Sequence, residues 1–245
     1  MKLDFAELAA LLKEDTVITY KMQYQLFHSP RTQKELTLWF ADGAAMLLDH
    51  SLHLYGKENA LDRFLSDLTP GKEYSFFGVA TSLLPLLEKH FTGIVQDEDC
   101  TAYTLTPEDF SGAPESLDTL TVADAEFVNE HWTYKDEGSL EFFKHILKAY
   151  PSSAIRVDGK LAGWAVCYDA IDDMANLGSL RVLEPYRHLG YGRKLASSLI
   201  AKVLAAGKTP MIHIIDSNIA SRNLSMGIGF KPHNKKIFWG SGIKK

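Results

Sequence analysis

An arginine and two glycines in the segment 187–192 have the residue types and the spacing of an anion-binding turn. Arg187, Gly190 and Gly192 form the pattern R-x-x-G-x-G directly before a long amphipathic segment. The first turn of a helix carries backbone N–H groups without intrahelical partners and the positive end of the helix dipole. Glycine lets the backbone approach a phosphate closely and adopt turn angles that a Cβ resists. The pattern therefore predicts phosphate binding, although two glycines that merely close a strand-to-helix connection would give the same pattern.

A predicted strand and a predicted helix flank this turn and hold it in place. The apolar stretch 175–182 is typical of a strand, and the segment after the turn carries Leu195, Leu199 and Val203 on one stripe of a helix. At Gly178 we expect a β-bulge that separates the strand from its neighbour. Beyond the helix, the pattern predicts a cap at Gly207, a strand over 211–215, a short helix over 219–226 and a strand pair over 230–240.

The composition of the chain argues against several classes of function. With 26 Lys and Arg against 31 Asp and Glu, the 245 residues carry a formal net charge of −5, so we expect no nucleic-acid partner. Two distant cysteines, Cys100 and Cys167, and the lack of a cationic and apolar leader predict a reduced, cytoplasmic protein. No apolar run is long enough to span a bilayer, so we expect no membrane partner.

The first half of the chain is typical of a smaller α/β unit. His50 and His53 lie in it without nearby cysteine or carboxylate partners, so we predict no metal site. Acidic and small residues cluster up to Pro114, and the boundary that we predict there gives domains 1–112 and 113–245. The elements expected before it are a helix over 3–12, a hairpin of strands 36–40 and 45–54 around Ala41-Asp42-Gly43, a helix over 59–68, a strand over 74–79 and a helix over 82–90.

The second half predicts an α+β domain with a mixed sheet. Its first elements are helices over 122–132 and 140–149 and two strands, 154–157 and 161–168, around an Asp-Gly turn. The order helix, Gly-Lys, strand, helix and Phe occurs twice in the chain, ending once at Phe91 and once at Phe230. This echo suggests that the first half is a degenerate copy of the second.

The second half resembles the GNAT superfamily of acyl-coenzyme A-dependent N-acyltransferases. The resemblance covers about residues 117–240 and rests on two linked motifs, Val182 to Gly192 and Asn218-x-Ala220-Ser221 leading to Gly229-Phe230. Together these motifs are specific, whereas either alone is not. The segment 120–149, with Trp132 in it, is most similar to the glycine N-acyltransferase-like branch. The GNAT fold is therefore expected in the C-terminal half, and that branch also carries a divergent GNAT-like N-terminal half.

The resemblance implies where acetyl-CoA or another acyl-CoA binds as co-substrate. Backbone amides of the turn would hold the pyrophosphate, and the pantetheine arm would lie along the strand before it, where a backbone N–H polarises the thioester carbonyl. The residues predicted to contact the co-substrate are Leu180, Val182, Arg187, His188, Leu189, Gly190, Tyr191, Gly192, Arg193, Asn218 and Ser221.

Three further residues bear on catalysis. Many GNAT proteins place a glutamate base on the fourth strand, where this chain has Asn176, and a tyrosine acid in the fourth helix, where it has Ser225. Asn176 accepts no proton at neutral pH, and because Ser225 replaces the tyrosine acid, water or Tyr191 would protonate the leaving thiolate. His213 is the best candidate base because an imidazole titrates near neutrality, but the same position suits a histidine of the core.

These observations predict an enzyme that transfers an acetyl or other acyl group to the amine of a small molecule or amino acid, directly in a ternary complex. The alternative is a coenzyme A-binding module with weak or no catalysis, which Asn176 and Ser225 suggest. A dinucleotide-binding oxidoreductase is disfavoured because Leu195 occupies the position where its fingerprint needs a small residue. The sequence does not identify the acceptor amine, and it does not decide between a monomer and a homodimer.

Overall fold

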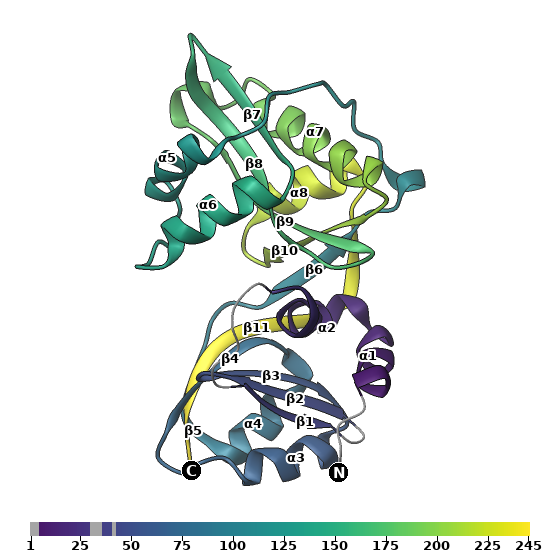
Figure 1. Ribbon diagram of the computed structural model, residues 1–245, viewed down its shortest axis with the longest axis vertical. Coiled ribbons are helices and arrows are strands. Elements are labelled where there is room, and N and C mark those ends of the chain that lie inside the picture. Colours follow the sequence, from purple (N-terminus) through teal and green to yellow (C-terminus); the bar gives the residue numbers. More distant parts are fainter. Residues whose placement is uncertain (1–4, 30–35, 41–42) are drawn as a thin grey trace. The chain divides into compact units, whose positions relative to one another are not determined.

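The computed structural model describes residues 5–29, 36–40 and 43–245 of the chain (Figure 1). The chain forms two compact units, each treated separately below. Unit 1 consists of Met1–Ala102, Ile214–Ser217 and His233–Lys245, and unit 2 consists of Tyr103–His213 and Asn218–Pro232. The chain crosses from one unit to the other within or beside strands. The two units therefore reflect how residues pack and do not mark domain boundaries in the sequence. The domain division after residue 112 stays a prediction.

Unit 1 is built on a mixed sheet. An antiparallel meander of three strands is followed by a fourth strand parallel to the third, and the C-terminal strand then pairs antiparallel with the fourth on one side and with the fifth on the other. The strands are β1 (Leu36–Phe40), β2 (Gly43–Leu48), β3 (Ser51–Gly56), β4 (Glu73–Ala80), β5 (Phe91–Gln96) and β11 (Lys231–Lys244).

The helices of unit 1 bury apolar residues against this sheet. Phe76 of β4 packs edge-to-face on Phe91 and Phe238, with ring centroids 5.1 and 6.2 Å apart, and leucines of the third and fourth helices join the same core. Burial of such rings is the main stabilising term of a unit of this size. The helices are α1 (Phe5–Lys13), α2 (Thr16–Gln23), which continues into a π-helical turn (Tyr24–His28), α3 (Glu58–Ser66) and α4 (Leu84–His90).

Several predicted elements of unit 1 need correction. The strand predicted over 45–54 is two strands, because the chain turns at Asp49, whose φ of 55° is one that aspartate tolerates better than most residues. The predicted pair over 230–240 is the single strand β11. Helix α2 was not predicted, although Asp15 caps it by accepting the N–H of Ile18 at 3.2 Å. The start of the predicted helix at residue 3 and the turn residues 41 and 42 lie outside the described residues.

Unit 2 repeats the order of elements in unit 1. Two helices precede an antiparallel meander, a helix then leads to a strand parallel to the last strand of the meander, and another helix follows. The strands are β7 (Ser152–Val157), β8 (Lys160–Ala170) and β9 (Met174–Val182), together with β6 (Cys100–Thr104), which begins in unit 1, and β10 (Thr209–Ile215), which ends in unit 1. The helices are α5 (Ala125–Glu130), α6 (Ser139–Ala149), α7 (Tyr191–Ala205) and α8 (Ile219–Ile228). The expected mixed α/β fold is confirmed.

Helices cover both faces of the meander in unit 2 (Figure 1). Trp164 and Val166 of β8 point into the core that β8 forms with α5 and α6. On the other face, Gly163 lies so close to α7 that a Cβ there would be 3.0 Å from Leu195. Alternation along β8 therefore fixes α7 on the face opposite α5 and α6. Gly207 ends α7 with a φ of 71°, as predicted.

Candidate functional site

The turn that precedes α7 adopts a backbone that suits glycine. β9 ends at Val182, a single 3-10 turn follows over Glu184–Tyr186, and α7 begins at Tyr191. Gly190, the N-cap residue, has a φ of 77°, and His188 has a φ of 63°. Residues with a Cβ pay about 1–2 kcal/mol in this left-handed region, a cost that His188 bears and that glycine avoids at position 190.

The first turn of α7 presents backbone donors and no negative charge. The first helical bond runs from the N–H of Lys194 to the carbonyl of Gly190, at 3.2 Å. The N–H groups of Tyr191, Gly192 and Arg193 precede that bond, and they are the groups that a helix leaves without intrahelical acceptors. Within the described chain no side chain caps this end, and the first turn contains no acidic residue. These features together favour an anion.

Gly192 lies in the helix itself, so backbone conformation does not explain a glycine there as it does at Gly190. A Cβ at Gly192 would lie 3.8 Å from Leu224 and 3.9 Å from Leu180, which are ordinary van der Waals distances. The helix itself would therefore accept alanine at this position. What the glycine provides is open space beside the donors of the first turn.

The basic side chains around the turn contact the protein itself. Arg187 donates from Nε to the carbonyl of Val182 at 3.2 Å, and Arg193 donates to the carbonyl of Gly227 at 2.9 Å. Lys194 forms an exposed ion pair with Glu115 at 2.9 Å. Arg187 and Arg193 thus fasten the turn to β9 and α8. Leu189 projects from the turn with 57% of its surface exposed.

Strands β9 and β10 pair over only part of their length. Their parallel register runs from Thr209 opposite Met174 to Ile212 opposite Leu177. Beyond this point β9 bulges: Gly178 is level with Val166 of β8, but Arg181 is level with Trp164, so β9 has one extra residue. The predicted bulge at Gly178 is confirmed.

The backbone of Val182 faces away from β8. Leu183 donates its N–H to the carbonyl of Ala162 in β8 at 2.9 Å. Because successive residues of a strand direct their N–H and C=O groups to opposite sides, those of Val182 point to the other edge. The contact of its carbonyl with Arg187 agrees with this direction.

The proposed catalytic residues lie on different elements. Asn176 of β9 is 3% exposed and stands between Asp169 of β8 and Met211 of β10 in the strand register. His213 is half-buried and lies one residue beyond the last paired residue of β10. It lies two positions after Met211, so it is about 7 Å along the strand from the level of Asn176. Ser225 is buried in α8.

The second motif of the sequence forms the two ends of α8. Asn218 accepts the N–H of Ser221 through its side-chain oxygen at 3.1 Å, which makes it the N-cap. Gly229 ends the helix with a φ of 117°, and a Cβ there would lie 1.9 Å from the carbonyl oxygen of Asp109. The Asn-x-x-Ser and Gly-Phe signals therefore have a structural reason in helix capping and close packing.

Tyr168 of β8 is a residue of this region that sequence reasoning missed. It lies half-buried beside the bulge, and its hydroxyl interacts with Trp132 and with Ser179. Burial raises the pKa of Tyr168 to about 12, although these hydrogen bonds act in the opposite direction. The available signal was an aromatic residue on one strand and a glycine on the next, and their contact is recognisable only once the register is known.

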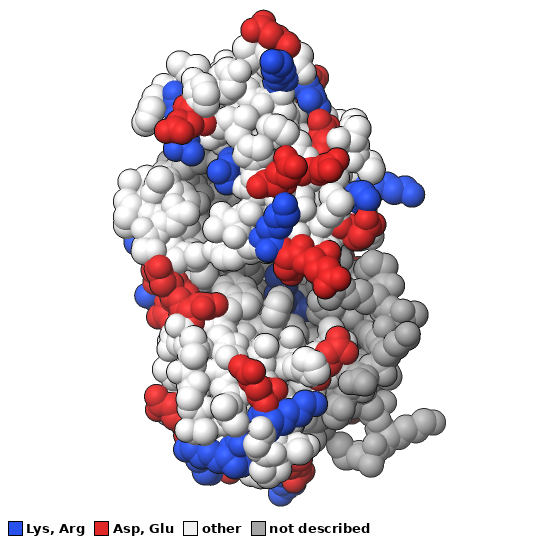
Figure 2. All heavy atoms as spheres, turned by 90° about the vertical axis from the view of Figure 1, so that its left-hand side faces the viewer, with Lys and Arg blue, Asp and Glu red and all other residues white. Residues whose placement is uncertain are grey.

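Charges and possible metal ligands elsewhere are scattered. Figure 2 shows acidic and basic side chains interspersed over the face that it draws. In the described ranges, no group of three His, Cys, Asp or Glu is placed to hold a metal ion. None of the helices in those ranges is both long and apolar enough to cross a membrane.

Comparison with known proteins places this geometry in a known fold. Residues 156–239 match the family model described as FR47-like protein. A Drosophila protein of known structure superposes with a TM-score of 0.74 at 18% identity, covering 98% of this chain and 97% of its own. A GNAT-family acetyltransferase from Colwellia psychrerythraea gives a TM-score of 0.62 at 12% identity, covering 94% and 96%.

A third similar structure is itself a tandem GNAT protein. It comes from the clavulanic acid biosynthesis pathway and gives a TM-score of 0.54 at 13% identity, covering 97% of this chain and 95% of its own. At these identities the structures establish the fold alone. The chain has the fold of the GNAT acetyltransferases, and unit 2 holds most of the segment that matches the family model.

Proposed function

We propose that the protein is an N-acyltransferase that transfers an acetyl or other acyl group from acyl-CoA to the amine of a small molecule or amino acid. The observation that carries this proposal is the combination of free helical donors at the start of α7 with the end of β9–β10 pairing at Leu177. The first feature suits a pyrophosphate, and the second leaves strand backbone available to an extended ligand.

The residues present fit coenzyme A. The N–H groups of residues 191–193 would bind the pyrophosphate, and Gly192 leaves room beside them because it has no Cβ. Leu180, 40% exposed, and the outward N–H of Val182 would line the pantetheine arm. The turn residues His188 to Gly192 would surround the pyrophosphate. Arg187 and Arg193 would support the turn through their contacts with Val182 and Gly227, and Asn218 and Ser221 would hold the start of α8.

The thioester of bound acyl-CoA supplies an activated acyl carbonyl. In the transfer an amide bond forms between the acyl carbon and the acceptor nitrogen, the C–S bond breaks, the amine loses a proton and the thiol gains one. Val182 would orient the carbonyl and stabilise charge on its oxygen through its N–H. His213 would take the proton of the amine. Asn176 would contribute only hydrogen bonds, because an amide accepts no proton at neutral pH.

A second candidate is a coenzyme A-binding module with little or no catalysis. Asn176 and Ser225 stand where the resemblance to GNAT enzymes calls for an acid–base pair, and both side chains are buried. Coenzyme binding would then serve recognition or regulation.

Thiol release separates the two candidates. Purified protein would be incubated with acetyl-CoA and longer acyl-CoAs and a panel of amines and amino acids, and binding of coenzyme A would be measured by calorimetry on the same preparation. Acyl transfer to any amine supports the enzyme. Tight binding without turnover across the panel supports the module, and no binding contradicts both. Turnover with glycine would also support the glycine N-acyltransferase-like branch.

The role of His213 has its own test. A His213→Gln variant keeps a polar side chain of similar length but cannot act as a base near neutral pH. We expect turnover to fall about 100-fold, with the greatest loss below the pH at which the amine is neutral without help. Wild-type turnover over the same pH range would remove His213 from the mechanism.

A further inference from the structure

The ring of Tyr168 lies directly on the bulge of β9. A Cβ at Gly178 would lie 2.0, 2.5 and 2.6 Å from three atoms of this ring. No side chain fits between them, so the tyrosine ring occupies the place that a residue at position 178 would otherwise use. The glycine and the tyrosine are therefore one packing unit across the strand pair.

The hydroxyl of Tyr168 is hydrogen-bonded to Ser179, which lies in the bulge. Its oxygen faces the backbone N–H and the hydroxyl of Ser179 and the indole N–H of Trp132. Ser179 has a φ of 40°, a left-handed conformation that costs a residue with a Cβ about 1–3 kcal/mol. The hydrogen bonds that Ser179 donates to the Tyr168 oxygen offset that cost and hold the bulge in one conformation.

Neighbouring rings hold Tyr168 itself. Its ring centroid lies 6.5 Å from that of Trp132 and 5.6 Å from that of Phe142. Trp132 and Phe142 in turn stack on each other at 6.1 Å with an interplanar angle of 26°. The phenol is thus fixed on the α5 and α6 side of the sheet while its oxygen reaches the bulge.

The bulge decides which backbone groups of β9 face its outer edge. Without the extra residue, the register that begins with Gly178 opposite Val166 would place Val182, and not Leu183, opposite Ala162. The N–H of Val182 would then point into the β8 ladder, because a shift of one residue reverses the direction of every group. The outward N–H of Val182 exists only while the bulge is kept.

We infer that Tyr168 is a positioning residue for acyl transfer, acting through Ser179 to keep the bulge and so direct the N–H of Val182 to the acyl carbonyl. This inference rests on the proposed function, in which that N–H orients the reacting group. Tyr168 remains a neutral phenol in this role and transfers no proton.

The test compares Tyr168→Phe with Tyr150→Phe. The first variant keeps the ring over Gly178 and removes only the hydroxyl. Tyr150 is, like Tyr168, a partly buried member of the same apolar cluster, and its ring contacts that of His145 at 6.2 Å, so the second variant controls for the loss of a tyrosine hydroxyl elsewhere in this cluster. Steady-state kinetics would be measured at a temperature where circular dichroism shows both variants folded, together with amide hydrogen exchange at Ser179 by NMR.

For Tyr168→Phe we expect kcat to fall about 10- to 100-fold with KM for acyl-CoA changed less than about 3-fold, since misplaced orienting groups cost rate more than binding. Exchange of the Ser179 amide should be faster, and Tyr150→Phe should match the wild type in both. Wild-type kcat in Tyr168→Phe, or an equal loss in both variants, would overturn the inference while leaving the acyltransferase in place. A wild-type protein without turnover would overturn the proposed function, and this inference with it.

Discussion

Two parallel strand pairs, β3–β4 in unit 1 and β9–β10 in unit 2, occupy equivalent places in the order of elements. They differ in what lies beyond their paired residues and in the connection that follows the first strand of each pair. Each follows an antiparallel meander, and each is joined by a helix, α3 or α7. The β3–β4 register covers Ser51 opposite Ser75 and Leu52 opposite Phe76, and the β9–β10 register ends at Leu177. Both pairs therefore stop pairing before their strands end.

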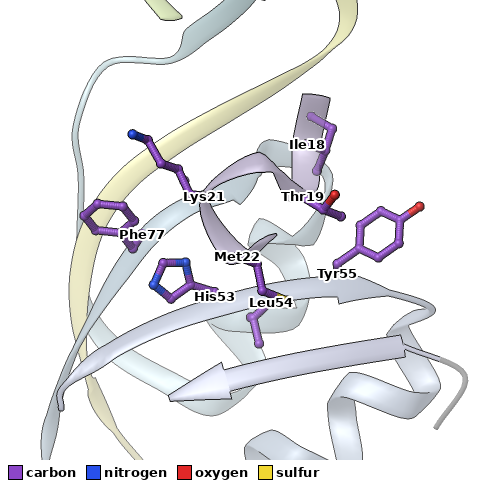
Figure 3. A pocket seen from close by; sticks show the side chains of 9 residues that line it. Ile18, Thr19, Lys21, Met22, His53, Leu54, Tyr55 and Phe77 are labelled. Carbon is purple, nitrogen blue, oxygen red and sulfur yellow. The ribbon is translucent and has the colours of Figure 1, made fainter. Parts of the chain in front are cut away.

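In unit 1, helix α2 fills the space beyond the paired residues. Figure 3 shows α2 crossing β3, with His53 lying beside Phe77 of β4. The two rings are 5.0 Å apart, and Met22 of α2 also packs against α1 and β2. The cavity that remains has a volume of about 10 Å³, which is room for about one water molecule. An extended ligand has no place here while α2 is folded.

The connections that follow β3 and β9 also differ in charge and conformation. Only Lys57 separates β3 from α3, and Glu58 lies in the first turn of that helix. Eight residues, 183–190, separate β9 from α7, and the first turn of α7 contains no acidic residue. A carboxylate among the helical donors competes with a bound anion. The same order of elements thus gives a helix N-terminus free of acidic residues, as the proposed phosphate site needs, only after β9.

The largest effect expected from this difference concerns stoichiometry. If α2 and Glu58 exclude the coenzyme from unit 1, calorimetric titration of coenzyme A should give one site per chain. The protein concentration would be fixed independently by amino-acid analysis. Two sites per chain would mean that the β3–β4 pair also binds the coenzyme, and the comparison would fail.

The next effect is acid destabilisation through His53. Burial, with a smaller contribution from Lys21, lowers the pKa of His53 from 6.5 to about 3. The unfolded chain therefore takes up a proton below pH 6.5 that the folded chain refuses, and stability is lost as the pH falls from 6.5 towards 3. At about 1.4 kcal/mol per pH unit, the loss should reach about 2 kcal/mol by about pH 5.

Urea denaturation between neutral pH and about pH 5 measures this loss. His53→Leu should flatten the dependence of unfolding free energy on pH, because it removes the titrating group. His50→Gln, at an exposed position on the same hairpin, should leave the dependence unchanged. If the unfolding free energy of wild type and of His53→Leu depended on pH in the same way, His53 would not be the group whose burial causes the loss of stability in acid.

A glycine at each end of α7 allows a matched test of the turn. Gly190 and Gly207 have φ values of 77° and 71°, and neither would place a Cβ within 4 Å of another group. Valine at either position should destabilise the fold by similar amounts, about 1–2 kcal/mol. Only Gly190→Val should weaken coenzyme A binding, by about 10- to 100-fold. Equal Kd values for the two variants would contradict the assignment of the turn.

The smallest effect concerns the helices that follow the two strand pairs. α4 begins without a side-chain cap, whereas Asn218 caps α8. Asn218→Ala should lower the free energy of unfolding by about 1 kcal/mol, and Asn218→Ser should restore it. If Asn218 acts only through the cap, both variants keep the wild-type Kd for coenzyme A. A weaker Kd in Asn218→Ser at unchanged stability would instead indicate direct contact with the ligand.

The elements of unit 2 could be predicted because local signals agreed there. The stripe of Leu195, Leu199 and Val203 and the glycine at position 207 define α7 without reference to the rest of the fold. In unit 1 the local signals were weaker, and the β-branched start of α2 concealed a helix that tertiary packing stabilises. The turn at Asp49 was hidden because both flanking strands are apolar.

The candidate site could be predicted only in part. The turn is a local motif, so its place before α7 and its left-handed glycine could be predicted from residue type, whereas phosphate binding there stays a prediction. The register of β8 and β9 is a property of three-dimensional pairing, so the link from Tyr168 to Ser179 could not be read from spacing. The sequence pattern of Asn218 and Gly229 was specific for the fold, yet the structure gives it a capping role that spacing alone does not distinguish from ligand contact.

The position of β11 imposes an order on folding during synthesis. This strand lies between β4 and β5, and Phe238 contributes to the core of unit 1. Although unit 1 begins the chain, the ribosome makes the strand that joins its sheet after almost all of unit 2. Until then β4 and β5 expose edges that invite wrong pairing. Unit 1 therefore cannot complete its sheet until nearly all of unit 2 has been synthesised.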